Sequence, residues 1–299
     1  FPDGRSMDAP TFVWWPENPR VDGVAAAGDV DGDGFGDLIV GGTDQSVSFV
    51  YGEALPAGAD DTIELCRQTT LTLDGGNVSF GRQVTTLGDL DGDGCAETAV
   101  GAPTDDLQNN NEGSVRVIWG FGPSCDRADP AFTIYAGGIA NDQYGFAMDG
   151  SADADGDGLN DLLVSSPLRS INNDRVGSVF FVPGSRILAS LPDAVSSTDG
   201  TVPSAPVEAL FLPTTPLLHS FHPSAGFGRS VAWTRDAGGA LYAAVGMPFL
   251  DQDAHLRTGG VALYAVTGGA LELAPRWVIG GETFREDSDF GLVLTGDAG

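Results

Sequence analysis

Acidic residues spaced two apart are the feature of this sequence that can do chemistry. Three segments read DVDGDGFGD from Asp29, DLDGDGCAE from Asp89 and DADGDGLND from Asp153. In each, acids occupy positions 1, 3, 5 and 9, and glycine occupies positions 4 and 6. Oxygen ligands of this number suit a hard cation with flexible coordination, which is Ca²⁺ before Mg²⁺. Without a cation the carboxylates would repel one another, and the loop would open or take up protons.

The expected ligands of each loop are its four carboxylates and the backbone carbonyl at position 7, while glycine at position 6 allows a sharp turn. The predicted ligand sets are Asp29, Asp31, Asp33, Phe35 and Asp37; Asp89, Asp91, Asp93, Cys95 and Glu97; and Asp153, Asp155, Asp157, Leu159 and Asp161. We therefore expect three Ca²⁺ sites. A structural brace is the favoured role of the metal, and a calcium sensor that changes shape is the alternative.

An EF-hand is the rival interpretation of such a loop. It requires flanking helices and a bidentate acid at position 12. Here position 12 is Val40, Val100 or Val164, each inside an apolar run that is typical of a strand. The EF-hand interpretation therefore fails.

The acidic loops belong to a longer repeat, with steps of 60 and 64 residues between their first aspartates. A fourth copy keeps one acid, Asp236, and is expected to bind no metal; a fifth begins at Phe290. After each loop the pattern predicts a third and a fourth strand. The predicted third strands are Gln45–Tyr51, Gly113–Trp119, Gly177–Val182 and Gly259–Tyr264, and the fourth are Thr69–Leu73, Ala131–Tyr135, Val207–Leu212 and Pro275–Ile279. Four strands in about sixty residues suit one blade of a β-propeller.

The residues around the second loop resemble a known family. Phe80-Gly81 and Gly101-Ala102-Pro103 frame that loop as in the FG-GAP repeat of integrin α-chain β-propellers. Tyr144-Gly145 is a variant of the first pair, and in the first copy Asp22-Gly23 stands in its place. The resemblance covers nearly the whole chain and implies an all-β propeller of four-stranded blades.

Propellers of this family have seven blades, whereas residues 1–299 supply four full repeats and part of a fifth. We expect a single propeller domain that is cut short at its C-terminal end. A segment at Thr11–Trp15 resembles an outermost strand that would close a ring. A smaller, five-bladed ring stays open as the alternative.

Charge limits the classes of partner. The formal net charge of −28 comes from 42 acidic and 14 basic residues, which excludes nucleic acid and disfavours anionic membrane surfaces. No stretch of eighteen apolar residues occurs, so no membrane insertion is expected. At millimolar calcium and a Kd near 10 μM, each site would add about 2.7 kcal/mol of stability. In the cytosol such sites would be empty, which predicts a secreted or cell-surface protein.

Alternate connections of an antiparallel sheet emerge on opposite faces, so four longer loops should lie opposite the acidic loops. They are residues 104–112, 168–176, 213–226 and 249–258. Binding residues concentrate on loops of a rigid scaffold, and the integrin resemblance implies that this face meets a protein or glycan ligand. The chain is therefore predicted to be an adhesion or protein-interaction module and not an enzyme. The alternative is the propeller of a secreted hydrolase whose catalytic groups lie outside this chain.

Two further expectations concern the loops themselves. Cys95 and Cys125 should share a face, so a disulfide between them is favoured, with Cys66 as the competing partner. An insertion at Pro183–Pro206 in the third repeat is expected to be a flexible loop on the metal face.

Overall fold

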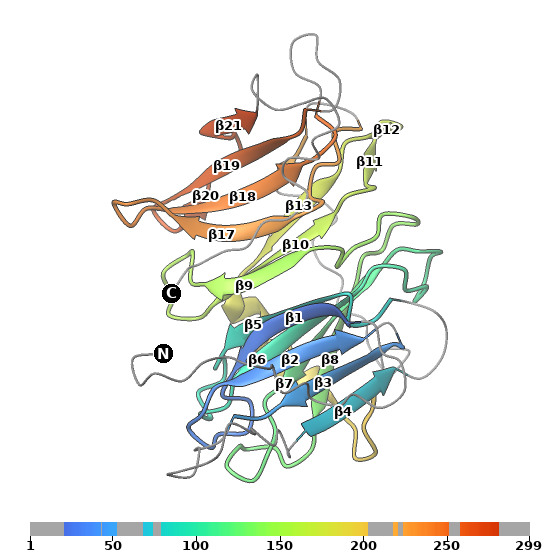
Figure 1. Ribbon diagram of the computed structural model, residues 1–299, viewed down its shortest axis with the longest axis vertical. Helices are drawn as coiled ribbons and strands as arrows, with labels where there is room; N and C mark the ends of the chain where they lie inside the picture. The colour runs from blue at the N-terminus through green and yellow to red at the C-terminus, as the bar shows by residue number, and fades with distance from the viewer. Residues whose placement is uncertain are drawn as a thin grey trace, which may run out of the picture.

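The computed structural model describes residues 21–42, 44–52, 68–73, 79–202, 218–220, 224–250 and 258–280. Within these ranges the chain is all-β, as predicted, apart from the short helix α1 (Gly184–Leu188) and the 3-10 turn η1 (Leu191–Asp193) (Figure 1). Neither of these two helical segments has the length or the apolar character needed to cross a membrane.

Four antiparallel sheets follow one another along the chain, and each begins with a hairpin that contains one of the repeated loops (Figure 1). The first sheet contains β1 (Val21–Gly28), β2 (Asp37–Gly42), β3 (Ser46–Val50) and β4 (Gln68–Leu73). The second contains β5 (Gln83–Gly88), β6 (Glu97–Ala102), β7 (Ser114–Trp119) and β8 (Ala131–Ala136). The third contains β9 (Met148–Ala152), β10 (Asp161–Ser166), β13 (Ser178–Val182) and β16 (Leu218–His219). The fourth contains β17 (Val231–Arg235), β18 (Leu241–Met247), β19 (Gly260–Thr267) and β21 (Trp277–Gly280), with β20 (Ala270–Leu271) as a second partner of β19.

The four sheets contact one another through their first strands, β1, β5, β9 and β17, which lie side by side in chain order. The Thr86 hydroxyl donates to the Ala27 carbonyl at 2.9 Å, which joins β5 to β1. The backbone N–H of Trp233 donates to a carboxylate oxygen of Asp149 at 2.8 Å, which joins β17 to β9. Each loop that follows a first strand is therefore held at one edge of a common stack.

The aromatic residue and the glycine that precede these strands have separate physical roles. Phe80, Tyr144 and Phe227 are fully buried and fill the core between neighbouring sheets. Gly81 and Gly145 have φ values of +87° and +84°, and a Cβ would stand 2.8 Å and 2.5 Å from the nearest backbone carbonyl oxygen. Only glycine fits that conformation and that space.

The sequence predicted most of these strands within one to three residues. One prediction was misplaced: the strand that pairs with β13 at the outer edge of the third sheet is Leu218–His219, whereas the predicted segment 207–212 lies outside the described residues. The predicted strand at 11–15 and the fifth copy from Phe290 also lie outside them. The loop at 168–176 contains a small hairpin of β11 (Ser170–Ile171) and β12 (Asp174–Arg175).

The expectation of a flexible insertion after residue 183 was wrong. Residues 183–202 contain α1, η1, β14 (Val195–Ser196) and β15 (Thr201–Val202). Strand β14 pairs antiparallel with β8, and β15 pairs parallel with β4. This segment of the third repeat thus covers the outer edges of the second and first sheets. Ladder hydrogen bonds offered by open strand edges, together with burial of Ile187 and Val202, account for its order.

The register of the first hairpin corrects another prediction. Val24 pairs with Val40 in the first sheet, as Val84 pairs with Val100 in the second. Asp22 is therefore the counterpart of Arg82, and Asp22-Gly23 is not the counterpart of the Phe-Gly pair. The strand pairing fixes this alignment. The sequence-based alignment was wrong because Gly23 resembled the glycine of a Phe-Gly pair.

Candidate metal centre

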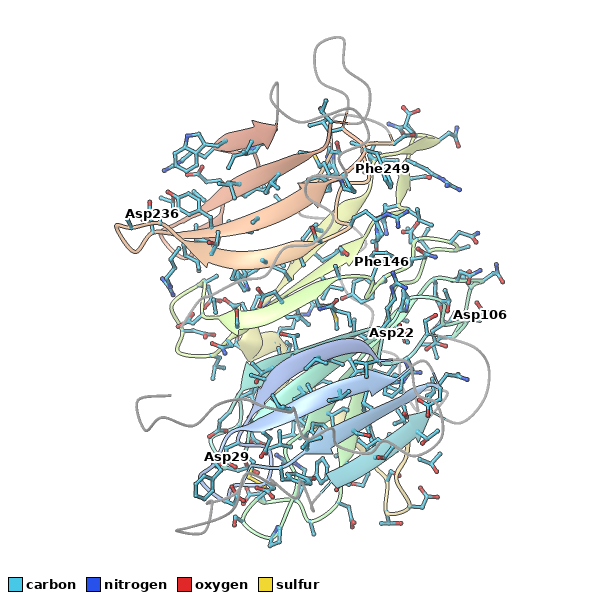
Figure 2. All side chains as sticks on the ribbon, viewed as in Figure 1. Asp22, Asp29, Asp106, Phe146, Asp236 and Phe249 are labelled. Atoms are coloured by element: carbon cyan, nitrogen blue, oxygen red, sulfur yellow. A yellow bond between two sulfur atoms is a disulfide. The ribbon has the colours of Figure 1, made fainter. Side chains whose placement is uncertain are left out.

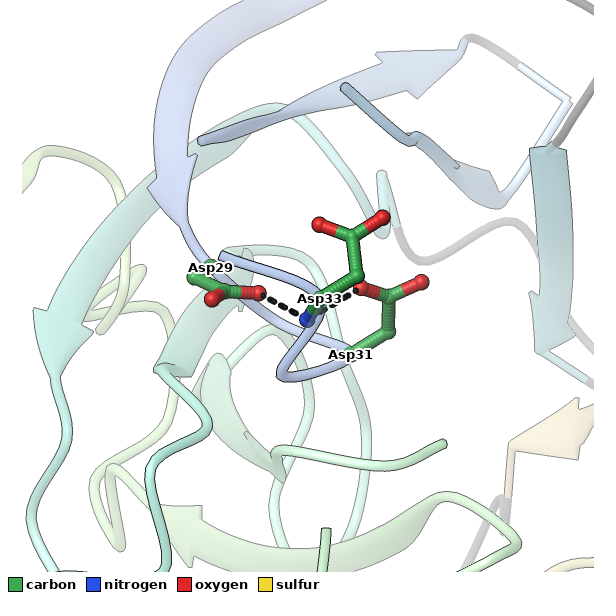
Figure 3. A group of neighbouring side chains, drawn as sticks. All are labelled: Asp29, Asp31 and Asp33. Carbon is green, nitrogen blue, oxygen red and sulfur yellow. Dashed lines mark hydrogen bonds between the residues drawn. The ribbon is translucent and has the colours of Figure 1, made fainter. Parts of the chain in front are cut away.

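The three acidic loops each bring carboxylates together at the end of a first strand. Figure 3 shows the first loop, where one oxygen each from Asp29, Asp31 and Asp33 lies within 4.8 Å of the others. In the second and third loops the corresponding groups are Asp89, Asp91 and Glu97, and Asp153, Asp155 and Asp161. Position 9 thus belongs to the converging group in two loops, whereas position 5 belongs to it in the first.

Backbone N–H groups hold these carboxylates in place before any ion binds. The position-1 aspartate accepts the N–H of the position-6 glycine at 2.8, 3.0 and 2.9 Å in the three loops. The position-5 aspartate accepts the N–H of residue 7 at 2.9 Å in all three. The position-6 glycines, Gly34, Gly94 and Gly158, have φ values of +89°, +90° and +93°, and a Cβ added to any of them would meet no atom within 4 Å. The left-handed backbone alone requires glycine there, as the sequence predicted.

The position-9 acid joins each loop to the connection after the third strand. Asp37 accepts the N–H groups of Val30 and Gly52, both at 2.8 Å. Glu97 accepts those of Leu90 and Gly120 at 2.6 and 3.0 Å. In the third loop, Asp161 accepts those of Ala154 and Gly184 at 2.7 and 2.8 Å.

These position-9 acids are buried, with Glu97 and Asp161 fully inaccessible to solvent. Burial raises the pKa of Glu97 to about 8, against the opposing effect of its two backbone hydrogen bonds. Burial likewise raises the pKa of Asp37 and of Asp161. A divalent cation beside such a group would stabilise its ionised form.

The second loop has an internal cation and a covalent link. The guanidinium of Arg127 forms salt bridges with Asp91 and, at 3.2 Å, with Asp93. A disulfide joins Cys95 to Cys125, with the Cα atoms 5.8 Å apart. This confirms the favoured pairing; the competing Cys66 lies outside the described residues. No arginine among the described residues pairs with the carboxylates of the third loop.

The first loop also contacts the next sheet. The Ala96 N–H donates to the Asp29 carbonyl at 2.6 Å, and the Phe121 N–H donates to the Val30 carbonyl at 3.1 Å. An ion held by the first loop would therefore brace the contact between two sheets as well as one hairpin.

The arrangement fits a divalent cation, because converging carboxylates, hard donors and short backbone-braced turns are what Ca²⁺ binds. The backbone carbonyls of Phe35, Cys95 and Leu159, and the carboxylates outside the converging groups, stay predicted ligands. In the fourth loop Asp236 accepts the N–H groups of Gly238 and Ala240. Within the described part of the chain it belongs to no converging acidic group.

Sequence reasoning missed Arg127, which lies 36 residues beyond Asp91. The available signal was the chain order: Cys125 was already predicted to face the second loop, and Arg127 is two residues further on.

The segment around the second acidic loop also matches a known protein family. The FG-GAP repeat family matches residues 80–118, which contain β5, the second loop, β6 and nearly all of β7. Residues 80–118 are therefore an FG-GAP repeat, and the chain is similar to integrin-like FG-GAP repeat proteins. It is 35% identical to Integrin alpha-PS2 of Drosophila melanogaster over 155 residues, 47% of this chain and 11% of that protein. It is also 35% identical to Phosphatidylinositol-glycan-specific phospholipase D of Rattus norvegicus over 163 residues, 50% of this chain and 18% of that protein.

The chain thus spans less than a fifth of the length of either relative. Its acidic loops and its second-to-third-strand connections lie on opposite sides. Figure 2 shows Asp29 and Asp236 on the left, and Asp106 and Phe249 on the right.

Proposed function

We propose that this FG-GAP repeat chain is part of an extracellular or cell-surface β-propeller in which three Ca²⁺ ions brace successive blades and the opposite face binds a protein or glycan ligand. The observation that carries the proposal is the convergence of three carboxylates at the same place in three successive sheets. Sheets joined through their first strands are also what radial packing of propeller blades requires.

Bound Ca²⁺ would supply charge neutralisation to a crowded group of acids. The protein's own residues would position the carboxylates and link the loop to its sheet. Carboxylates at positions 1 and 3 are held by N–H groups of their own turn, and the position-9 carboxylate links that turn to the connection after the third strand. Neutralising one loop would therefore stabilise the first hairpin and the third strand of its sheet together.

Two observations support an extracellular setting. Disulfides such as Cys95–Cys125 persist in oxidising compartments and are rare in the cytosol. Calcium sites built from exposed turns are filled at extracellular calcium and largely empty at cytosolic calcium. The similarity to Integrin alpha-PS2 supports an adhesive or recognition role.

The similarity to Phosphatidylinositol-glycan-specific phospholipase D favours a second candidate, in which the same module accompanies a hydrolase domain elsewhere in a longer protein. The two candidates share the calcium-braced module and differ in what lies beside it. The full reading frame around this segment discriminates them, because further repeats favour the first and a catalytic domain favours the second.

Isothermal titration with calcium tests the proposal. We expect three ions per chain, and two after Asp153→Asn with Asp155→Asn in the third loop. Asp174→Asn, an exposed acid of β12, is the control and should keep three. A wild-type chain that takes up no calcium at millimolar concentration would refute the metal sites.

A further inference from the structure

Two arginines stand over one phenylalanine ring on the side away from the acidic loops. The guanidinium carbon of Arg82 lies 4.5 Å from the centroid of the Phe146 ring, and that of Arg229 lies 5.1 Å from the same centroid. Arg229 is also 5.4 Å from the centroid of Phe249. Figure 2 shows Phe146 and Phe249 on the side opposite Asp29. We call these four residues the arginine–phenylalanine cluster.

The repeat itself assembles this cluster. Arg82 directly precedes β5, and Phe146 and Arg229 lie two residues before β9 and β17. Each follows the buried aromatic residue and the glycine of its own repeat. Because the first strands lie side by side, equivalent positions in three sheets meet. The cluster therefore stands on rigid strand ends.

Other arginines that contact aromatic rings have acidic partners. Arg116 lies over Phe80 and forms a 2.8 Å salt bridge with Asp105. Arg169 lies over Phe180 and forms a 2.9 Å salt bridge with Asp142. In this chain an arginine on an aromatic ring is thus commonly neutralised by the protein's own carboxylate.

Within the described part of the chain, Arg82 and Arg229 have no such acidic partner. Among the residues that the structure describes, no carboxylate lies within salt-bridge distance of either guanidinium, and Nε of Arg229 is buried without a hydrogen-bond acceptor. Burial and then the nearby charge of Arg82 lower the pKa of Arg229. Two neighbouring cations that no described carboxylate neutralises, in a chain with 42 acidic and 14 basic residues, would attract an anion from outside.

We propose that the arginine–phenylalanine cluster binds a carboxylate side chain of an acidic segment in a partner protein. The planar guanidinium fork matches the two oxygens of a carboxylate, and phenylalanine rings can cover the methylene groups beside it. A polyanionic glycan or an anionic membrane would bring many charges close to a chain of net charge −28, whereas a short peptide segment brings few. This inference rests on the binding role proposed for this face and specifies the chemistry of its partner.

Asp22 marks the boundary of the site. It is exposed, and it is the counterpart of Arg82 in the first sheet. An incoming carboxylate would be repelled by it and would sit toward Arg229. Removing the Asp22 charge should therefore strengthen binding of an acidic peptide, which a merely structural role for the arginines would not explain.

The test measures fluorescence polarisation of a short labelled peptide that carries glutamates between glycines, in calcium buffer at low salt. The same peptide with glutamines is the control ligand. We expect the glutamate peptide to bind more tightly, Arg82→Gln with Arg229→Gln to weaken it by about tenfold, and Asp22→Asn to tighten it. Arg235→Gln, an exposed arginine at the opposite end of β17, is the matched control and should leave the affinity unchanged.

Equal binding of the two peptides, or wild-type affinity in the double variant, would overturn the proposal, as would preferential binding of heparin or of anionic vesicles. If the double glutamine variant fails to fold, Arg82→Lys with Arg229→Lys keeps the charge and removes the fork, and an intermediate affinity is expected. Thermal midpoints in calcium and in chelator separate this inference from the proposed function. If the peptide does not bind but calcium still raises the thermal midpoint, only the proposal for the cluster fails. If calcium does not raise the midpoint, the proposed metal sites fail.

Discussion

The backbone N–H of Gly120 donates a 3.0 Å hydrogen bond to Glu97 Oε1, and this bond ties the second acidic loop to the connection between β7 and β8. The other carboxylate oxygen accepts the Leu90 N–H at 2.6 Å. Asp37 and Asp161 make the same pair of bonds in their own sheets. Each position-9 acid is therefore a structural link as well as a predicted ligand.

Glu97→Gln should destabilise the protein both with and without calcium. An amide has one acceptor oxygen, so its NH₂ group would face one of the two N–H donors and leave it unsatisfied in the interior. An unsatisfied buried donor costs about 1–3 kcal/mol. Guanidinium unfolding above pH 8, where the Glu97 carboxyl is ionised even without calcium, measures the loss, and the exposed Asp129→Asn is the control on the same connection. Equal stability of Glu97→Gln and the wild type in chelator would show that the link contributes nothing by itself.

Removing the disulfide should lower stability by about 3.6 kcal/mol, because Cys95 and Cys125 close a loop with a sequence separation of 30. The variant to use is Cys95→Ser with Cys125→Ser, since a single change would leave a reactive thiol. Reductant should likewise lower the unfolding midpoint of the wild type. A double variant as stable as the oxidised wild type contradicts this prediction.

Arg127→Gln should tighten calcium binding at the second loop while lowering the stability of the calcium-free protein. Arg127 neutralises Asp91 and Asp93 when no ion is present, and it repels a cation that approaches them. Isothermal titration should show one of the three sites strengthened and the others unchanged. Arg186→Gln, in α1, is the control. Unchanged affinity at all sites would mean that Arg127 does not act on the second loop.

Asp142 should make stability depend on pH. Burial raises the pKa of Asp142 to about 6, against the charge of Arg169 at 2.9 Å. Because the folded pKa exceeds the unfolded value near 3.9, the folded state binds the proton more tightly. The stability that protonated Asp142 contributes is fully present below the unfolded pKa, and it is lost as pH rises through about 6.

The wild type should therefore lose stability relative to Asp142→Asn between pH 4 and pH 7. Thermal midpoints of the two proteins across that range measure the difference, in which titration of the acidic loops cancels. A constant difference across the range contradicts the raised pKa.

The spacing of the acids was enough to predict the three loops, because position within a tight turn depends on nearby residues alone. The same holds for the buried aromatic residue and the glycine before each first strand. The position of Arg127 depends on how the connection after β7 folds back, which no local pattern records. The segment 183–202 was also beyond prediction, since strands of two residues have no periodicity and form only because β8 and β4 offer open edges. Asp22 was misaligned because strand register, not the neighbouring glycine, fixes its place.

Thermal unfolding with and without calcium tests the central claim most directly. Three sites at a hundredfold excess of calcium over Kd would each add about 2.7 kcal/mol, and each kcal/mol raises the midpoint of a chain of this size by roughly 2 °C. We predict that millimolar calcium raises Tm by on the order of 15 °C over the chelator-treated protein. The variant with Asp153→Asn and Asp155→Asn should show about two thirds of that rise. Superimposable melts in calcium and in chelator would contradict the account.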